Sequence, residues 1–376
     1  MNTFTKKRMR LMGMIRKESL QILRDPSSIA IAFVLPVILL LLFGYGVSLD
    51  AKGVRLATVV EQPDTNTTSL IGSFQQSEYF VPIVYNSIQE AEEALRSLKV
   101  DGIVWLRNDF SNRLLSRNNA PIGVYVNGVD ANQARITEGY IQGVWQNWLL
   151  NYTHDQGQDL KIPVLLEPRI WFNAAVNSRY FLVPGLIAVI MTLIGAMLTS
   201  MVVAREWERG TMEALMVTPI HIREIVIGKL VPYFILGMGG MFLSVAMAVW
   251  LFDVPLRGSF WALTAASALF MMVALGMGLL ISIVAKSQFV AGQVSIIVTF
   301  LPAFILSGFI FQISSMPDAI QFITHVIPAR YFVAILQTLF LAGNIWPVIL
   351  SNAAALLIMM FIFLGLVKRK ARKQLD

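Results

Sequence analysis

Residues 205–219 decide the fold, and they read Arg205-Glu-Trp-Glu-Arg-Gly-Thr-Met-Glu-Ala-Leu-Met-Val-Thr-Pro219. This charged island stands between two long apolar runs, so it must lie outside a lipid bilayer, where burying charge is costly. Gly210-Thr211 breaks the chain and offers an N-cap for a short second helix that ends at Thr218-Pro219. The pattern fits a solvated loop, and it equally fits a segment that transmits force from a soluble partner to the flanking spans.

The composition of the chain is that of an integral membrane protein. Of 376 residues, 56% are hydrophobic and 14% are charged, whereas soluble domains carry roughly 25% charged residues. The net charge of +7 comes from basic residues beside apolar runs, as is typical of membrane-flanking charge. Nucleic acid is therefore excluded as a partner. Cysteine is absent, so no disulfide identifies the compartment.

Apolar runs on both sides of the charged island predict six transmembrane helices. The predicted spans are residues 27–48, 180–204, 230–252, 258–285, 287–311 and 345–367. Residues 331–342 are too few to cross a core of about 30 Å at about 1.5 Å per residue. We therefore expect a re-entrant or interfacial segment at about 317–342. A basic tail, residues 368–376, follows the last span.

The N-terminal 26 residues predict a basic amphipathic helix on the membrane surface. Seven Lys and Arg residues precede the first span. No small-residue cleavage site follows, so the first apolar run is interpreted as a retained signal anchor. Asp25-Pro26 is a typical helix start, with Asp as the N-cap and Pro at the first helical position.

Residues 49–179 differ in character and predict a small α/β domain with the outline β-α-β-α-β-β-α. Its predicted strands and named helices cover residues 54–60, 81–85, 87–98, 102–106, 122–126 and 130–152. Trp145 and Trp148 lie on one face of the last helix and either fill the domain core or meet a partner. The domain has no spacing typical of a metal site, a nucleophile elbow or a phosphate loop, and His154 is interpreted as a surface residue.

The distribution of Lys and Arg predicts which side the termini occupy. Basic residues gather before the first span, in residues 205–229 and in the tail, whereas the short opposite loops hold only Arg257 and Arg330. The positive-inside rule then makes both termini and residues 205–224 cytoplasmic. Residues 49–179 become extracytoplasmic.

Two absences narrow the function. The central parts of the six spans carry no ionisable residue, which disfavours an ion-coupled transporter. The chain also has no G-x-x-x-x-G-K-[ST] motif, so it cannot bind nucleotide through a P-loop of its own. Any energy source must therefore be another chain.

At this point the residues resemble a known family, the type-2 ABC exporter permeases. The segment beginning at Arg205 looks like the family's cytoplasmic coupling motif. Further stretches agree across nearly the whole chain: Arg24-Asp-Pro-Ser, Trp171-Phe-Asn, Tyr180-Phe-Leu-Val-Pro-Gly, Ser307-Gly-Phe-Ile-Phe, Met316-Pro and Pro328-Ala-Arg-Tyr-Phe. The nearest resemblance is to bacterial multidrug-type permeases of the inner membrane with an extracytoplasmic domain between the first two spans.

The resemblance implies a transport subunit that is not itself an enzyme. It implies a dimer with an identical or similar permease, bound to two separate ATPase subunits that hold ATP and Mg²⁺, with a membrane-fusion adaptor as a further candidate partner. No cofactor or metal is expected in this chain. The alternative function is a mechanical transmitter or membrane receptor whose spans carry no cargo, and a neighbouring gene for an ATPase or adaptor would separate the two.

The resemblance assigns the coupling residues and the route of the cargo, and the residues of spans two and five offer a lining for that route. ATPase coupling is assigned to Arg205, Glu206, Trp207, Glu208, Arg209, Gly210, Thr211, Met212, Glu213, Leu215 and Met216. A translocation path along spans two and five would be lined by Thr192, Thr199, Ser200, Ser295, Thr299, Phe300, Phe304 and Phe309. This uncharged, aromatic lining would suit amphipathic or apolar compounds. Arg330 and Tyr331 are expected at the outer mouth, with Arg330 paired to Asp318 or to lipid phosphate.

Overall fold

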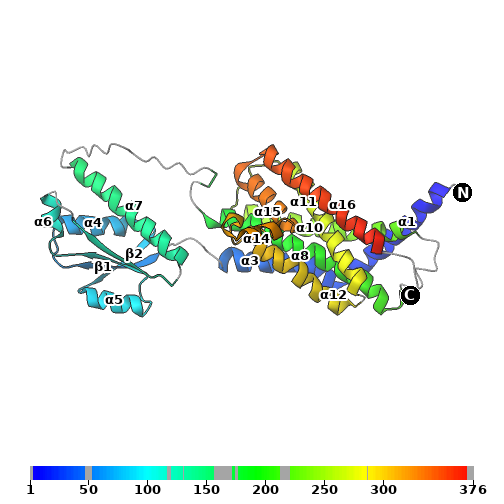
Figure 1. Ribbon diagram of the computed structural model, residues 1–376, viewed down its shortest axis with the longest axis horizontal. Coiled ribbons are helices and arrows are strands. Elements are labelled where there is room, and N and C mark those ends of the chain that lie inside the picture. The colour runs from blue at the N-terminus through cyan, green and yellow to red at the C-terminus, as the bar shows by residue number, and fades with distance from the viewer. Residues whose placement is uncertain are drawn as a thin grey trace. The chain divides into compact units, whose positions relative to one another are not determined.

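The computed structural model describes residues 3–46, 53–116, 120–129, 131–155, 172–173, 177–211, 221–285 and 287–370. The chain divides into two compact units, one made of residues 1–48 and 170–376 and the other of residues 49–169 (Figure 1). The first unit is helical and the second contains the sheet.

Six helices among the described residues are long and apolar enough to cross a membrane. Two of these spans are interrupted by a π-helical turn, η1 in the first and η2 in the fifth. The spans are α2–η1–α3 (Pro26–Ile29, Ala30–Val34, Leu35–Gly46), α8 (Ser178–Glu208), α10 (Ile222–Trp250), α11 (Phe260–Ala285), α12–η2–α13 (Gln288–Ser295, Ile296–Phe300, Leu301–Leu306) and α16 (Trp346–Lys370). They confirm the predicted class of a polytopic helical membrane protein.

A bent helix pair precedes the last span. Helix α14 (Asp318–Thr324) meets the continuous stretch of α15 (Pro328–Gln337) and η4 (Thr338–Ala342) at 85°. Proline at the first position of α15 fits this break, because proline is compatible with a helix start but not with the interior of a preceding helix. A short 3₁₀ turn, η3 (Ile313–Ser315), lies just before the pair. The pair is either a broken span or a re-entrant segment.

Helix α8 is the centre of the helical unit. It packs against α3, α10, α11, α12 and α15, and almost every residue from Leu182 to Glu206 is buried. Small residues permit the close approach of α11: a side chain at Gly278 would collide with the Ala196 carbonyl and the Thr199 hydroxyl. The Thr199 hydroxyl also donates a hydrogen bond to the Leu275 carbonyl across this contact at 2.9 Å. Burial is so complete because α8 is apolar on all sides.

The second unit is a four-stranded α/β domain with strand order β2-β1-β3-β4. Strand β1 pairs in parallel with β2 and β3, and β4 is antiparallel to β3. The elements are β1 (Val54–Val60), α4 (Thr65–Gln76), β2 (Phe80–Tyr85), α5 (Ile88–Arg96), β3 (Gly102–Leu106), α6 (Phe110–Leu115), β4 (Ile122–Val126) and α7 (Ala131–Asp155). The short helix α6 between β3 and β4 was not predicted, because six residues are too few to show a helical period.

Both faces of the sheet are covered by helices. Figure 1 shows α4 and α7 on one face and α5 on the other. The first face holds the larger core, in which Trp148 is buried and its indole Nε1 donates to Ser69 Oγ at 3.0 Å. Trp145 is only partly buried against the same core. Of the two predicted roles for this tryptophan pair, the structure therefore favours core packing, and chiefly for Trp148.

Candidate functional site

The N-terminal helix α1 (Thr3–Leu23) packs against α10 along one side. Met14 and Ile22 are buried there, and Gly228 of α10 leaves the space that the Met14 side chain fills. Met9, Met12 and Leu23 remain exposed on α1. The inner side of α1 therefore packs against the helical unit, and its outer side is exposed. The sequence predicted a position on the membrane surface but did not predict the packing against α10.

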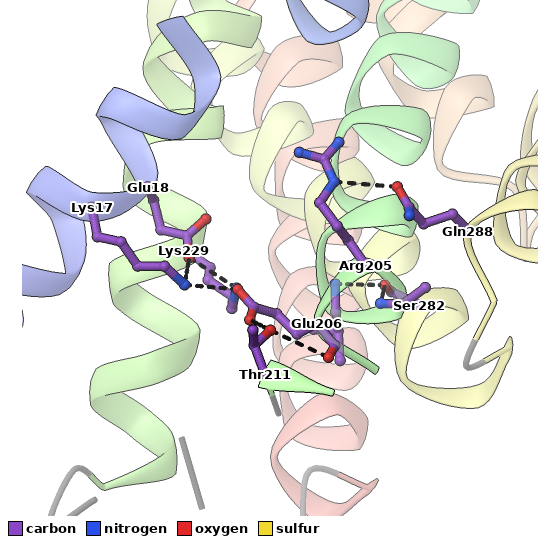
Figure 2. A network of polar contacts seen from close by, with 10 residues as sticks. Lys17, Glu18, Arg205, Glu206, Thr211, Lys229, Ser282 and Gln288 are labelled. Atoms are coloured by element: carbon purple, nitrogen blue, oxygen red, sulfur yellow. Dashed lines mark hydrogen bonds and ion pairs between the residues drawn. The ribbon is translucent and has the colours of Figure 1, made fainter. Parts of the chain in front are cut away.

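A buried cluster of ion pairs connects α1, α8 and α10 (Figure 2). The Lys229 ammonium lies 2.9 Å from a Glu18 carboxylate oxygen and 3.2 Å from one of Glu206, and all three side chains are at most 5% exposed. Lys17 lies 2.8 Å from the same Glu206 oxygen. Isolated buried charges are strongly unfavourable, so the two lysines and two carboxylates stabilise each other only while the three helices remain together.

Arg205 and Glu206 are neighbours in the chain, yet they contact different elements (Figure 2). The Arg205 guanidinium lies 2.7 Å from the carboxylate of Asp25, the N-cap of α2, and its Nε donates to Gln288 Oε1 at 3.2 Å. Gln288 in turn donates from its backbone and its side chain to Glu208. The cytoplasmic end predicted for α8 is thus tied to the first residues of two other spans.

The electrostatics of Asp25 follow from these contacts. Burial alone would raise the pKa of its carboxyl group. Hydrogen bonds from Ser27, Arg205 and Ser28 outweigh that effect and lower the pKa to about 2. Asp25 is therefore ionised at neutral pH and holds Arg205 as a charge-assisted pair.

Gly210 ends α8 in the way the sequence suggested. Its φ of +66° lies in the left-handed region that favours glycine and is common just after a helix. Thr211 then turns its hydroxyl back to the Glu206 carboxylate and backbone carbonyl. The proposed second helix, and with it Met212, Glu213, Leu215 and Met216, lies outside the described residues.

An apolar groove runs between the first and fifth spans with α8 behind it. It encloses about 560 Å³ and is lined by Ala30, Ile31, Val34, Leu35, Ile38, Leu39, Leu193, Met197, Ile296 and Phe300. Both π-helical turns, η1 and η2, contribute to its walls. Such turns are frequent at functional sites, because they displace side chains from the regular helical positions.

Comparisons with known proteins show the family of the chain. The family model described as ABC-2 family transporter protein matches residues 26–367. The chain belongs to this ABC-2 family. It is 43% identical over 368 residues, 98% of each chain, to the probable multidrug ABC transporter permease YbhS of Escherichia coli K12. It is 28% identical over 354 residues, 92% of this chain and 95% of the relative, to the probable multidrug ABC transporter permease YbhR of the same organism.

A more distant relative is the ABC transporter permease protein NatB of Bacillus subtilis, 26% identical over 379 residues, with 94% of this chain and 95% of the relative covered. This ABC-2 protein is therefore a multi-pass permease subunit of an ABC transporter, a class that associates with ABC ATPases. The resemblance inferred from the sequence is confirmed.

Within the ABC-2 permease, the predicted coupling residues divide into two groups. Arg205 and Glu206 are buried and bound to partners in the same chain, and their contact with an ATPase stays a prediction. Trp207 is half-buried, whereas Glu208, Arg209, Gly210 and Thr211 are exposed. Sequence reasoning missed Glu18, Asp25 and Gln288, although charged or amide residues flanking apolar runs were a signal for them.

The polar residues assigned to the translocation path are not on an open surface of the ABC-2 permease. The hydroxyls of Thr192, Thr199, Ser200 and Thr299 donate to carbonyls of their own helices three or four residues earlier. These residues and Ser295 are buried between helices. Their burial follows from the central position of α8, and a role of these side chains in the translocation path stays a prediction.

The aromatic residues assigned to the path form a cluster. Ring centroids of Phe300 and Phe304 are 5.7 Å apart, and Phe304 lies 5.9 Å from Phe43 and 5.8 Å from Phe309. Phe309 is buried against Gly185, where an added Cβ would lie 2.6 Å from its ring. Phe300 is half-buried and lines the groove. Among the predicted path residues, Phe300 is the one that lines the groove.

Arg330 contacts the bend between α14 and α15 instead of Asp318. Its guanidinium donates to the Thr324 hydroxyl and to the Gln321 carbonyl, and it lies 3.1 Å from His325 Nδ1. The Tyr331 hydroxyl donates to the His325 carbonyl at 3.0 Å. The predicted pairing with Asp318 is therefore wrong, because the 85° bend brings Arg330 to the C-terminal end of α14.

Proposed function

We propose that this permease is the membrane subunit of an ATP-driven exporter of amphipathic or hydrophobic compounds. Two relatives are named as probable multidrug permeases. The chain has no P-loop of its own, so a separate ATPase would bind ATP and Mg²⁺ and supply the energy. A second permease, identical or similar, would complete the transporter.

The observation that carries this proposal is that Arg205 and Glu206, although adjacent in the chain, bind different helices. Their side chains join the end of α8 to α1, to the N-cap of α2, to α10 and to α12. An ATPase that pushes on the exposed residues Glu208 to Thr211 would displace α8 together with the helices bound to it. Because α8 is packed on nearly all sides, such a displacement would reach the groove that it backs.

The groove supports the choice of cargo. Its ten lining residues are all apolar, and a charged compound would lose its hydration there without gaining a partner. Apolar or amphipathic compounds would gain from the same burial. We propose that the second permease closes this side of the helical unit and that cargo passes along it.

The basic flanks support an orientation with both termini in the cytoplasm of a bacterial cell and the α/β domain on the other side of the inner membrane. A relative is named as an inner membrane transport permease. The α/β domain would then be available to a membrane-fusion adaptor.

Co-expression with the candidate ATPase tests the proposal. We expect Glu208→Ala with Arg209→Ala to reduce co-purification of the ATPase and ATP-dependent transport into inside-out vesicles by about tenfold. The matched control is Glu93→Ala with Arg96→Ala, which removes the same two charges from the exposed side of α5. Intact assembly and transport in the Glu208/Arg209 variant would exclude the coupling role. Coupled ATP hydrolysis without transport of any hydrophobic compound would instead support the mechanical transmitter.

A further inference from the structure

A second cavity, of about 670 Å³, opens beside the ion-pair cluster. Residues of α1, the start of the first span, the end of α8 and the start of α12 line it. Four of its lining residues are basic, namely Lys17, Arg24, Arg205 and Arg209, and one, Asp25, is acidic. The cavity is therefore strongly cationic.

Two of the four basic groups are not neutralised by the described part of the chain. Arg205 is paired with Asp25, and Lys17 is paired with Glu206. Arg24 and Arg209 are exposed and have no carboxylate within ion-pair distance among the described residues. Two guanidinium groups that share one cavity favour an anion with several oxygens, because guanidinium binds phosphate oxygens in a bidentate manner.

The cavity lies at the level where the chain enters the membrane. Asp25 and Ser27 stand at the start of the first span, Gln288 begins the fifth, and Arg205 belongs to the last turn of α8. Leu20, which also lines the cavity, is 45% exposed. This depth is that of lipid headgroups, where basic residues and apolar side chains meet.

The apolar groove continues along the same three helices, deeper in the membrane. On the first span the lining passes from Ser27 in the cavity to Ala30 and Ile31 in the groove, one turn further. On α8 it passes from Arg205 to Met197, a rise of about 12 Å at helical geometry. On the fifth span it passes from Gln288 to Ile296 and Phe300. The cationic cavity and the apolar groove thus lie along the same three helices.

We propose that cavity and groove together bind one anionic phospholipid. Arg24 and Arg209 hold its phosphate, and one acyl chain lies in the groove between η1 and η2 while no cargo occupies it. A zwitterionic lipid would fit less well, because its own ammonium group faces the same guanidinium groups. The inference rests on the membrane-spanning arrangement and not on the proposed export, so it is tested on the permease without any ATPase.

The first experiment uses the full-length permease purified in a neutral detergent. Native mass spectrometry measures bound dioleoyl-phosphatidylglycerol, with dioleoyl-phosphatidylcholine and inorganic phosphate as the two other probes. We expect phosphatidylglycerol to bind about tenfold more tightly than phosphatidylcholine, and Arg24→Gln with Arg209→Gln to remove that preference. Both residues are exposed, so the variant keeps its fold.

The matched control is Lys368→Gln with Arg369→Gln. It removes the same charge from the exposed end of α16, outside the cavity, and should bind phosphatidylglycerol as the wild type does. If this variant lost the preference for phosphatidylglycerol to the same extent, the preference would depend on net charge alone, and the proposed site would be overturned. Equal binding of both lipids would overturn it too, as would inorganic phosphate that displaces phosphatidylglycerol at equal concentration.

A second variant tests the groove independently of charge. Val34→Trp fills the groove without touching the cavity residues. We expect it to weaken dioleoyl-phosphatidylglycerol about tenfold and to spare dihexanoyl-phosphatidylglycerol, whose acyl chains are too short to fill the groove. Equal effects on the long-chain and short-chain lipids would show that no acyl chain occupies the groove.

Discussion

The Glu206 carboxylate lies 3.2 Å from the Lys229 ammonium, and both side chains are almost completely buried at the ends of two adjacent membrane spans. Each group lies where an unpaired charge would be strongly unfavourable. Glu18 of the N-terminal helix shares the same ammonium. The pair therefore requires that α1, α8 and α10 keep their relative positions.

Lys229→Met should destabilise the helical unit by about 3–5 kcal/mol, because it leaves two buried carboxylates with only Lys17 to compensate them. The melting temperature of the detergent-purified permease measures this loss. Combining it with Glu18→Gln retains the Lys17–Glu206 pair and should restore part of the stability. The exposed Arg209→Gln is the control and should stay within about 0.5 kcal/mol. A double variant no more stable than Lys229→Met would contradict the cluster.

Asp25→Asn should remove the ion pair with Arg205 while keeping an N-cap for α2, because Asn caps as well as Asp. The folded-state pKa of Asp25 is about 2, below its ordinary value of 3.8. The charge contribution is therefore fully present above about pH 4 and is lost as the pH falls through about 2. We expect the free energy of unfolding of the wild type to exceed that of the variant by about 1–2 kcal/mol between pH 5 and 8. A melting-temperature difference that does not shrink between pH 5 and pH 2 would contradict this.

Gly278→Ala should force α8 and α11 apart and cost about 1–3 kcal/mol, because the new methyl group meets a backbone carbonyl that cannot rotate away. Gly365→Ala in α16 is the matched control. Nothing lies within 4 Å of its added Cβ, so it should be neutral or stabilising by up to about 1 kcal/mol. Equal melting temperatures of the two variants would argue against the close contact.

Trp148→Ala should destabilise the α/β domain by about 3–5 kcal/mol, because a buried indole and its hydrogen bond to Ser69 are both removed. Hydrogen exchange at β1 and β3 in the full-length chain measures the effect on the domain. Trp145→Ala should cost less, since its ring is only partly buried. The opposite ranking would show that Trp145 is the main core residue.

Phe300→Ala should change which hydrophobic compounds stimulate the ATPase of a reconstituted complex, because it enlarges the groove by an aromatic ring. Phe322→Ala, at an exposed position of α14 outside the groove, is the control and should keep the wild-type profile. Comparing stimulation across several compounds separates the two expectations. An unchanged profile in Phe300→Ala would remove the groove from the transport path and favour the mechanical transmitter.

Local patterns alone were sufficient to predict the six spans, the sheet domain and the family. An apolar run of about 20 residues can satisfy its backbone in lipid only as a helix, so it identifies a span without knowledge of its neighbours. The alternation of strand and helix signals in residues 54–126 was equally local. The motif at Arg205 depended on adjacent residues only, which is why it identified the family.

The partners of that motif were decided by tertiary packing. Asp25 is 180 residues from Arg205, Glu18 is 211 residues from Lys229, and Lys229 is 23 residues from Glu206. No local period connects positions so far apart. The same packing buried Thr192 and Thr199, two residues of the predicted path lining. Burial depends on how many helices surround a span. That number depends on where small residues such as Gly195 and Gly278 let helices approach closely. Only the tertiary structure, with all the spans packed together, determines it.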